Sequence, residues 1–239
     1  AGHMIECGSQ VTGGNFTDWH KVKSFQDMGY PIIEMQSDGD FFITKHKNTG
    51  GLVSVDTVRE QLFYEMGSPT SYITPDVVAD FSSIQLKQDS EDRVFVSSVK
   101  GFEPTPFYKV SMAYSDGYKS VGSILISSPN APEKAQAFAD IFWQRAGSDF
   151  VESSTELLGY NACHKSLSQQ KDVGEIELRL GVRDYDLDKL KTFGKMIPSL
   201  ILSGPPGCAA MGGVPKPSNV VSYWPALIDK QLIKPKVAA

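Results

Sequence analysis

Long apolar runs are absent from this 239-residue sequence. No window approaches the roughly 18 apolar residues of a membrane-spanning helix, and the chain does not open with the pattern of a secretory signal peptide. We therefore expect no membrane partner and a cytoplasmic or organelle-matrix location rather than a secreted one. The sequence has only three cysteines, Cys7, Cys163 and Cys208. Their odd number and wide spacing favour reduced thiols over a disulfide framework.

A surplus of positive charge is also absent. The chain has 23 Lys and Arg against 28 Asp and Glu, giving a net charge of −5, and both signs are interspersed. Proteins that bind the phosphate backbone present a basic stripe or patch. The sequence therefore argues against a nucleic-acid partner.

The common cofactor and nucleophile motifs are missing as well. There is no P-loop, no GxGxxG after a strand, no HExxH, no CxxC and no G-x-S-x-G elbow. Structural zinc needs closely spaced Cys and His ligands, whereas His20, His46 and His164 are scattered. We expect no metal site and no cofactor.

The hydrophobic share of 41% is enough for a core, and its periodicity predicts both helices and strands. The predicted helices cover 15–28, 57–66, 132–145 and 187–196. The predicted strands cover 32–36, 41–47, 77–87, 93–100, 108–114, 119–127, 151–159, 175–182 and 220–228. Asp116-Gly117 predicts a hairpin turn, and the Gly- and Pro-rich stretch 203–217 predicts a loop.

The order of these elements predicts an α+β fold with a mixed, mainly antiparallel sheet and helices packed on it. From residue 119 onward the order is strand, helix, strand, strand, helix, strand, which is the ferredoxin-like βαββαβ arrangement. We expect residues 1–117 to form a site-bearing segment and 118–239 the ferredoxin-like half, packed together as one unit. Both helices of that half should lie on one sheet face. The expected buried residues are Phe138, Phe142, Leu190 and Phe193, with Ile176, Leu178 and Leu180 beneath them.

The first residues of the chain gather chemically active side chains. His3, Glu6 and Cys7 include an imidazole, a carboxylate and a thiol, which together can supply a base and a nucleophile. These three are the candidate catalytic residues. If this segment is a strand, His3 and Cys7 share one face and Glu6 points to the other. The alternative is that Cys7 is a small buried apolar residue and Glu6 pairs with a lysine.

A second group of residues suits an anionic ligand. The candidate ligand-binding residues are Gln10, Thr12, Gly13, Gly14, Lys45, Gly50 and Gly51. Paired glycines let backbone N–H groups approach an anion, and Gly51 comes just before a predicted helix N-terminus. We expect Gly50 and Gly51 to face the same cleft as residues 6–14. The alternatives are plain turns for the glycines and a solvated strand face for Lys45.

Several motifs match a known family in order along the chain. They are Gly2-His3, Glu6-Cys7-Gly8, Gln10, Thr12-Gly13-Gly14, Gly29-Tyr30-Pro31-Ile32, Thr49-Gly50-Gly51-Leu52-Val53, the block from Val58 to Glu65 followed by Gly67-Ser68-Pro69, and Tyr72 with Pro75-Asp76-Val77 and Asp80-Phe81. Together they resemble the acyclic terpene utilisation (AtuA-like) family, with the strongest likeness up to about Gly117. The chain is similar to the second half of the main family domain.

This resemblance implies a role in the catabolism of acyclic terpenes and related branched acyl-CoA compounds. The function hypothesis is an enzyme, of lyase or hydratase type, acting on a small anionic or CoA-linked acyl substrate. The alternatives are a non-catalytic subunit or binding module, and a fragment that is inactive without its N-terminal half. We expect a missing N-terminal segment or a second chain, with a homo-oligomer as a further option, to cover an exposed apolar patch near Ile5 and 32–33.

Overall fold

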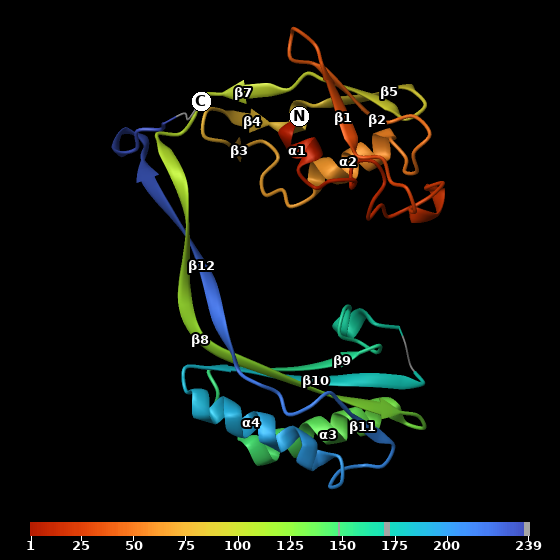
Figure 1. The fold of residues 1–239 in the computed structure, drawn as a ribbon, viewed down its shortest axis with the longest axis vertical. Helices are drawn as coiled ribbons and strands as arrows, with labels where there is room; N and C mark the ends of the chain where they lie inside the picture. Colours follow the sequence, from red (N-terminus) through yellow and green to blue (C-terminus); the bar gives the residue numbers. More distant parts are fainter. Residues whose placement is uncertain (148, 170–172, 237–239) are drawn as a thin grey trace. The chain divides into compact units, whose positions relative to one another are not determined.

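The protein forms two compact units, seen here in a computed structural model that describes residues 1–147, 149–169 and 173–236. The first unit comprises Ala1–Lys109 with Leu227–Ala239, and the second comprises Val110–Ala226. Each is described by itself, with elements labelled as in Figure 1. That the predicted halves pack as one unit stays a prediction.

The first unit contains a four-stranded and a three-stranded sheet, both antiparallel where their registers are defined. The four-stranded sheet has the order β1(Pro31–Met35), β2(Phe41–Lys45), β6(Arg93–Ser97), β5(Gln85–Ser90). The three-stranded sheet has the order β3(Tyr72–Ile73), β4(Val78–Asp80), β7(Lys100–Phe102). The helices are α1(Gly2–Ile5) and α2(Val55–Phe63), with 3-10 turns at Trp19–Lys21, Phe81–Ser83 and Lys230–Leu232.

The second unit is a five-stranded sheet with two helices. Its path is β11(Cys208–Met211), β8(Phe107–Ser127), β10(Glu175–Asp184), β9(Glu152–Leu158), and β12(Ser218–Asp229) also pairs with β8. The helices are α3(Ala131–Ala146) and α4(Leu187–Leu200), and a 3-10 turn covers Lys165–Leu167. β8 and β12 each extend into both units. The α+β class with mainly antiparallel sheets is therefore confirmed.

Both long helices cover the same face of the second unit's sheet (Figure 1), as predicted. The apolar stripes of α3 and α4 meet the inward-facing residues of β8, β9 and β10 in one core. All seven residues predicted to be buried there are at most 1% exposed. The ferredoxin-like assignment itself stays a prediction. Two strands, β11 and β12, pair with β8 in addition to β10, whereas the predicted arrangement has one final strand.

Local signals set the helix boundaries. Ser54 caps α2 in a capping box with Thr57. Asp186 caps α4 by accepting from the backbone N–H groups of Asp188 and Lys189. α3 carries a proline in its first turn, and Gly147 caps its C-terminal end. No helix in the described parts of the chain is long and apolar enough to cross a membrane.

Two predictions in the first unit are wrong. Residues 15–28 hold only the 3-10 turn Trp19–Lys21, because the carbonyls of Ser24 and Asp27 accept tertiary hydrogen bonds from Gly51 and Gly50 instead of bonding within a helix. The predicted strand 77–87 is broken into β4 and β5. A 3-10 turn lies between them, where the Asp80 side chain accepts from the backbone N–H of Ser82.

Two predictions in the second unit are also wrong. Gly117 does not turn a hairpin, and β8 runs through it from Phe107 to Ser127. Gly117 has φ of +79° and packs so closely that a Cβ would lie 2.8 Å from the Asp184 carbonyl oxygen, which identifies a glycine bend inside a continuous strand. The stretch 203–217, predicted as a loop, contains β11.

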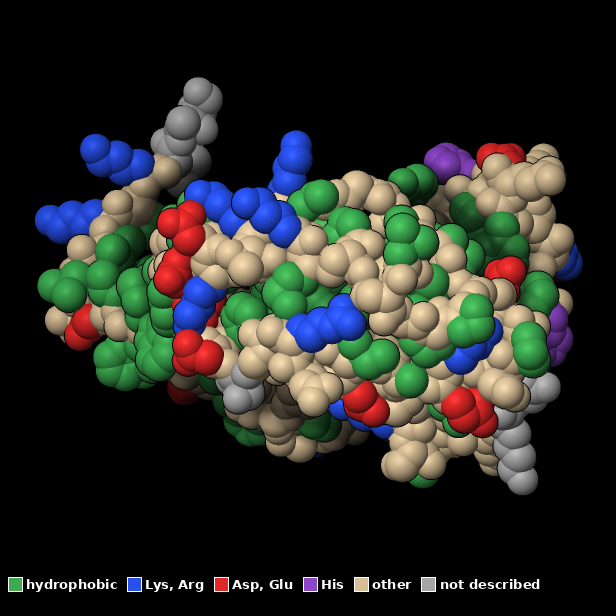
Figure 2. Space-filling view, turned by 90° about the horizontal axis from the view of Figure 1, so that it is seen from below, with side chains coloured by type: hydrophobic (Ala, Val, Ile, Leu, Met, Phe, Trp, Pro, Cys, Tyr) green, Lys and Arg blue, Asp and Glu red, His purple; other side chains and the backbone are tan. Residues whose placement is uncertain are grey.

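The surface of the protein carries both charge signs. On the face seen in Figure 2, Lys and Arg side chains are interspersed with Asp and Glu and do not gather into a patch of one sign. This distribution agrees with the mixed charge pattern of the sequence. It is unlike the basic stripe of a phosphate-backbone binder.

Truncating a large side chain in the core of the second unit should leave a cavity and lower the free energy of unfolding. Phe142 is fully buried and contacts both Trp143 and Phe193 edge to face. We expect Phe142→Ala to lower the free energy of unfolding by about 3–5 kcal/mol in urea denaturation. Leu202 is 96% exposed, so Leu202→Ala should change it by less than about 0.5 kcal/mol. Similar losses in the two variants would contradict this core assignment.

Candidate functional site

The N-terminal cluster is organised by a short helix rather than a strand. Because α1 places residues three apart on one side, His3 and Glu6 meet, with Nδ1 of His3 2.6 Å from Oε1 of Glu6. The two atoms are close but not aligned as in an ideal hydrogen bond. The expectation that Glu6 would point away from His3 is therefore wrong. Cys7 is half-buried with a free thiol.

Both the imidazole and the backbone carbonyl of His3 bond to residues of α2. Its Nε2 lies 3.2 Å from the Leu62 carbonyl oxygen, and the Gln61 side chain donates to the His3 carbonyl at 2.8 Å. A carbonyl can only accept, so Nε2 carries its hydrogen.

Two aromatic rings complete the surroundings of His3. The rings of Tyr72 and Phe81 have their centroids 5.5 and 5.6 Å from that of His3 and stack on each other at 4.7 Å. Burial raises the pKa of Tyr72, and the negative charge of Glu6 adds to this effect. Tyr72 therefore keeps its hydroxyl hydrogen at neutral pH. No chemical pattern in the sequence marks Tyr72 as a site residue, although it lies within one of the family motifs.

An apolar pocket of about 450 Å³ lies against the same residues. It is lined by Leu62, Phe63, Met66, Pro69, Phe81, Ser82, Ile84 and Leu86, with Arg59. Leu62 and Phe81 therefore contact His3 and also form walls of the pocket. The apolar part of the lining is suited to a hydrocarbon group, and Arg59 is the one charged residue among the described residues that line the pocket.

The residues after Cys7 form a tight turn region. The Thr12 hydroxyl donates to the carbonyls of Gly29 at 2.6 Å and Ser9 at 3.0 Å. Gly13 and Gly14 donate their backbone N–H groups to Gln10 and Ser9. Thr12 is fully buried, so these contacts fix the backbone. A ligand role for Gln10, Thr12, Gly13 and Gly14 stays a prediction.

The second glycine pair lies beside Thr12. The backbone N–H of Leu52 donates to the Thr12 carbonyl at 2.7 Å, which joins the two glycine-containing segments. That they face one cleft stays a prediction. The N–H groups of Gly50 and Gly51, however, donate to the carbonyls of Asp27 and Ser24. These groups are therefore already engaged, and anion binding by this pair stays a prediction.

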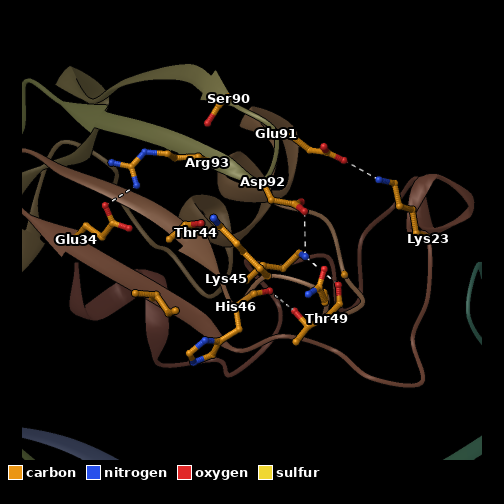
Figure 3. Close-up of a pocket in the computed structure, with 14 residues that line it drawn as sticks. Lys23, Glu34, Thr44, Lys45, His46, Thr49, Ser90, Glu91, Asp92 and Arg93 are labelled. Carbon is orange, nitrogen blue, oxygen red and sulfur yellow. Dashed lines mark hydrogen bonds and ion pairs between the residues drawn. The ribbon is translucent and has the colours of Figure 1, made fainter.

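Lys45 lines a separate cavity of about 690 Å³ (Figure 3). Its side chain is buried, so the alternative of a solvated strand face is wrong. The ammonium lies 3.0 Å from a carboxylate oxygen of Asp92 and donates to the Thr49 carbonyl, also at 3.0 Å. Asp92 also accepts from the backbone N–H of Val53, so Lys45 joins β2 to the segment before α2.

Two other cations at this cavity are also paired. Figure 3 shows Lys23 directed to Glu91, and Arg93 bonded to Glu34. This neutralisation weakens the cavity as an anion site. Within the described residues, no three His, Cys, Asp or Glu side chains are arranged to hold a metal ion.

The two parts of the expected apolar patch, Ile5 and residues 32–33, differ in their exposure to solvent. Ile5 is 46% exposed, as predicted. Ile32 and Ile33 are half-buried, and Ile33 packs against the core of the first unit. The predicted exposure is therefore confirmed for Ile5, whereas Ile32 and Ile33 are less exposed than predicted.

Comparison with known proteins gives one match. The family model described as acyclic terpene utilisation family protein AtuA matches residues 1–239, the whole chain. The chain belongs to this family. No curated protein and no solved structure matches it significantly. The family membership indicates a role in acyclic terpene utilisation.

Two glycines of this AtuA family member allow a matched test of the segment contact. Gly51 and Gly39 have nearly equal φ, +92° and +93°, but a Cβ on Gly51 would lie 2.5 Å from the Thr12 carbonyl oxygen, whereas one on Gly39 meets nothing within 4 Å. Gly39→Ala should cost about 1–3 kcal/mol from backbone strain alone. Gly51→Ala should cost a further 1–3 kcal/mol, roughly the penalty of overpacking. Equal losses in denaturant titrations would contradict the close contact.

Proposed function

We propose that this AtuA family protein acts on a branched acyl compound of acyclic terpene catabolism and moves a proton through the His3–Glu6 pair. The observation that carries the proposal is the 2.6 Å approach of the imidazole and the carboxylate. Such a pair is a general acid–base device. Family membership supports a substrate drawn from acyclic terpene utilisation.

The two members of the pair differ in their access to solvent. The His3 side chain is 6% exposed and that of Glu6 is 51% exposed. Glu6 therefore reaches a substrate, while His3 is fixed by α2 and supports it. In the proposed step the Glu6 carboxylate takes a proton from the carbon next to an acyl carbonyl. The C–H electron pair moves into an enolate, and the proton is then returned or transferred.

The apolar pocket supports the acyl part of this proposal. Its walls Leu62 and Phe81 contact His3 directly, so a hydrocarbon group there would lie close to the acid–base pair. The Arg59 guanidinium lines the same pocket and is half exposed, with Asp56 2.7 Å away. It can hold a carboxylate or the phosphate of a CoA-linked substrate.

A second candidate is a binding module without catalysis. It is favoured by the anchoring of His3, whose Nε2 and carbonyl both bond to α2. A histidine held in this way can simply fix the N-terminal segment. Under this candidate the pocket binds an acyl group but no proton moves.

A pair of glutamate variants tests the proposal. With branched and linear acyl-CoA thioesters in deuterated water, the wild type should exchange the proton next to the carbonyl or turn the substrate over. Glu6→Gln should lower kcat/KM by about 100-fold or more with little change in Tm. Glu103 is exposed, and Glu103→Gln serves as the control with wild-type behaviour.

The outcomes separate the two candidates. Binding of thioesters without exchange or turnover in the wild type would favour the binding module. Glu6→Gln with full activity would exclude the proposed base. A large loss of Tm in Glu6→Gln would show that Glu6 is structural.

The pocket generates its own prediction. Met66→Trp adds volume at the pocket wall, so the variant should raise KM for branched acyl thioesters while leaving acetyl-CoA less affected. Tyr64→Trp, a substitution on a neighbouring residue outside the lining, is the control. If KM rises equally for long and short acyl groups, the pocket does not hold the acyl chain.

A further inference from the structure

One stretch of β8 has an edge without a strand neighbour. β10 pairs with β8 from Tyr118 onward, and β11 pairs from Ser123 to Ile126. Before Tyr118, β12 is the only strand that pairs with β8 in the described part of the chain (Figure 1). Because a strand has two edges, one edge of residues 110–115 keeps its backbone N–H and C=O groups unpaired by any strand.

This edge lacks the usual protection against pairing. Soluble proteins protect exposed edges with charged residues, prolines or bulges. The stretch Val110–Ser115 reads VSMAYS and contains neither a charge nor a proline. β12 in contrast contains Pro225, which removes a backbone donor. Pairing with a further strand is therefore favoured at β8.

One face of this stretch carries large, exposed side chains without charge. Val110, Met112 and Tyr114 alternate along the strand and share one face, and they are 36%, 45% and 45% exposed. Ser222 donates to Asp116 at 2.7 Å, which places Ser222 on this face. By the same alternation Trp224, 60% exposed, lies there as well. Methionine and aromatic residues without charge are typical of an interface core.

Polar groups border this surface at the bend. Asp116 lies 3.1 Å from a guanidinium nitrogen of Arg183 and accepts from the Tyr185 hydroxyl at 2.9 Å. An uncharged centre beside a charged rim is the usual anatomy of a protein–protein interface. The surface does not resemble a site for a charged small molecule.

We propose that residues 110–115 of β8 pair with the same stretch of a second copy of this chain, antiparallel about a two-fold axis. An uncharged strand does not repel its own copy, and this pairing satisfies both free edges in one closed dimer. The pairing would satisfy the free backbone groups of both copies and bring their large side chains side by side on one face of the joined sheet. This inference does not depend on the proposed function.

Sedimentation velocity of the whole chain over a wide concentration range tests the dimer. The wild type should sediment with twice the chain mass of 26.2 kDa. Met112→Lys and Tyr114→Lys place a charge on the edge and should return the mass to that of one chain, with unchanged circular dichroism. Leu202→Lys, at a residue 96% exposed in the same unit, is the matched control and should remain dimeric.

Amide hydrogen exchange supplies an independent readout that needs no substitution. In the dimer, alternate amides of residues 110–115 should exchange more slowly as protein concentration rises. A wild type that stays at one chain mass, including one that associates only with a different protein, would overturn the proposal. So would a dimer that survives both lysine variants or is lost equally in Leu202→Lys.

Discussion

The site depends on the polar contact between the N-terminal segment and α2. His3 and Gln61 are both buried, and each satisfies a backbone or side-chain group of the other segment. A buried polar group left without a partner costs about 1–3 kcal/mol, so these bonds favour one position of α1. The positions of Glu6, of the aromatic rings around His3 and of the pocket walls follow from that contact.

The same contact explains how the His3–Glu6 pair combines a buried imidazole with an exposed carboxylate. Glu6 remains in water, where its charge is inexpensive, while the imidazole is held among Tyr72, Phe81 and α2. The pocket next to it has no charge of its own except Arg59. Glu6 and the pocket walls Leu62 and Phe81 therefore all contact His3.

Sequence patterns were sufficient where burial repeats with a regular period. The stripes of α3 and α4 and the alternation in β10 predicted their core correctly, because seven inward residues recur at helical or strand spacing. His3 and Glu6 were predicted as chemical groups, but their approach was not. A helix of four residues is too short to show a period, and its direction is set by α2.

The remaining errors share a cause in long-range contacts. Residues 15–28 carry helix signals, yet the Ser24 and Asp27 carbonyls bond to the distant Gly50 and Gly51. Asp116-Gly117 is a sequence typical of hairpin turns. In the structure Gly117 instead packs against the Asp184 carbonyl, and β8 continues through the bend. Tyr72 carried no spacing signal, since its relation to His3 arises only when β3 meets α1.

The Asp116 carboxyl makes the stability of the second unit depend on pH in the acidic range. Hydrogen bonds from Ser222 and Tyr185, together with the nearby Arg183 charge, hold the pKa of this carboxyl below its usual value. The ionised carboxylate therefore stabilises the folded state above about pH 4, and this contribution is lost as pH falls through the lowered pKa. Ser222 belongs to β12 and Arg183 to β10. Protonation of this one side chain therefore weakens contacts to two strands at once.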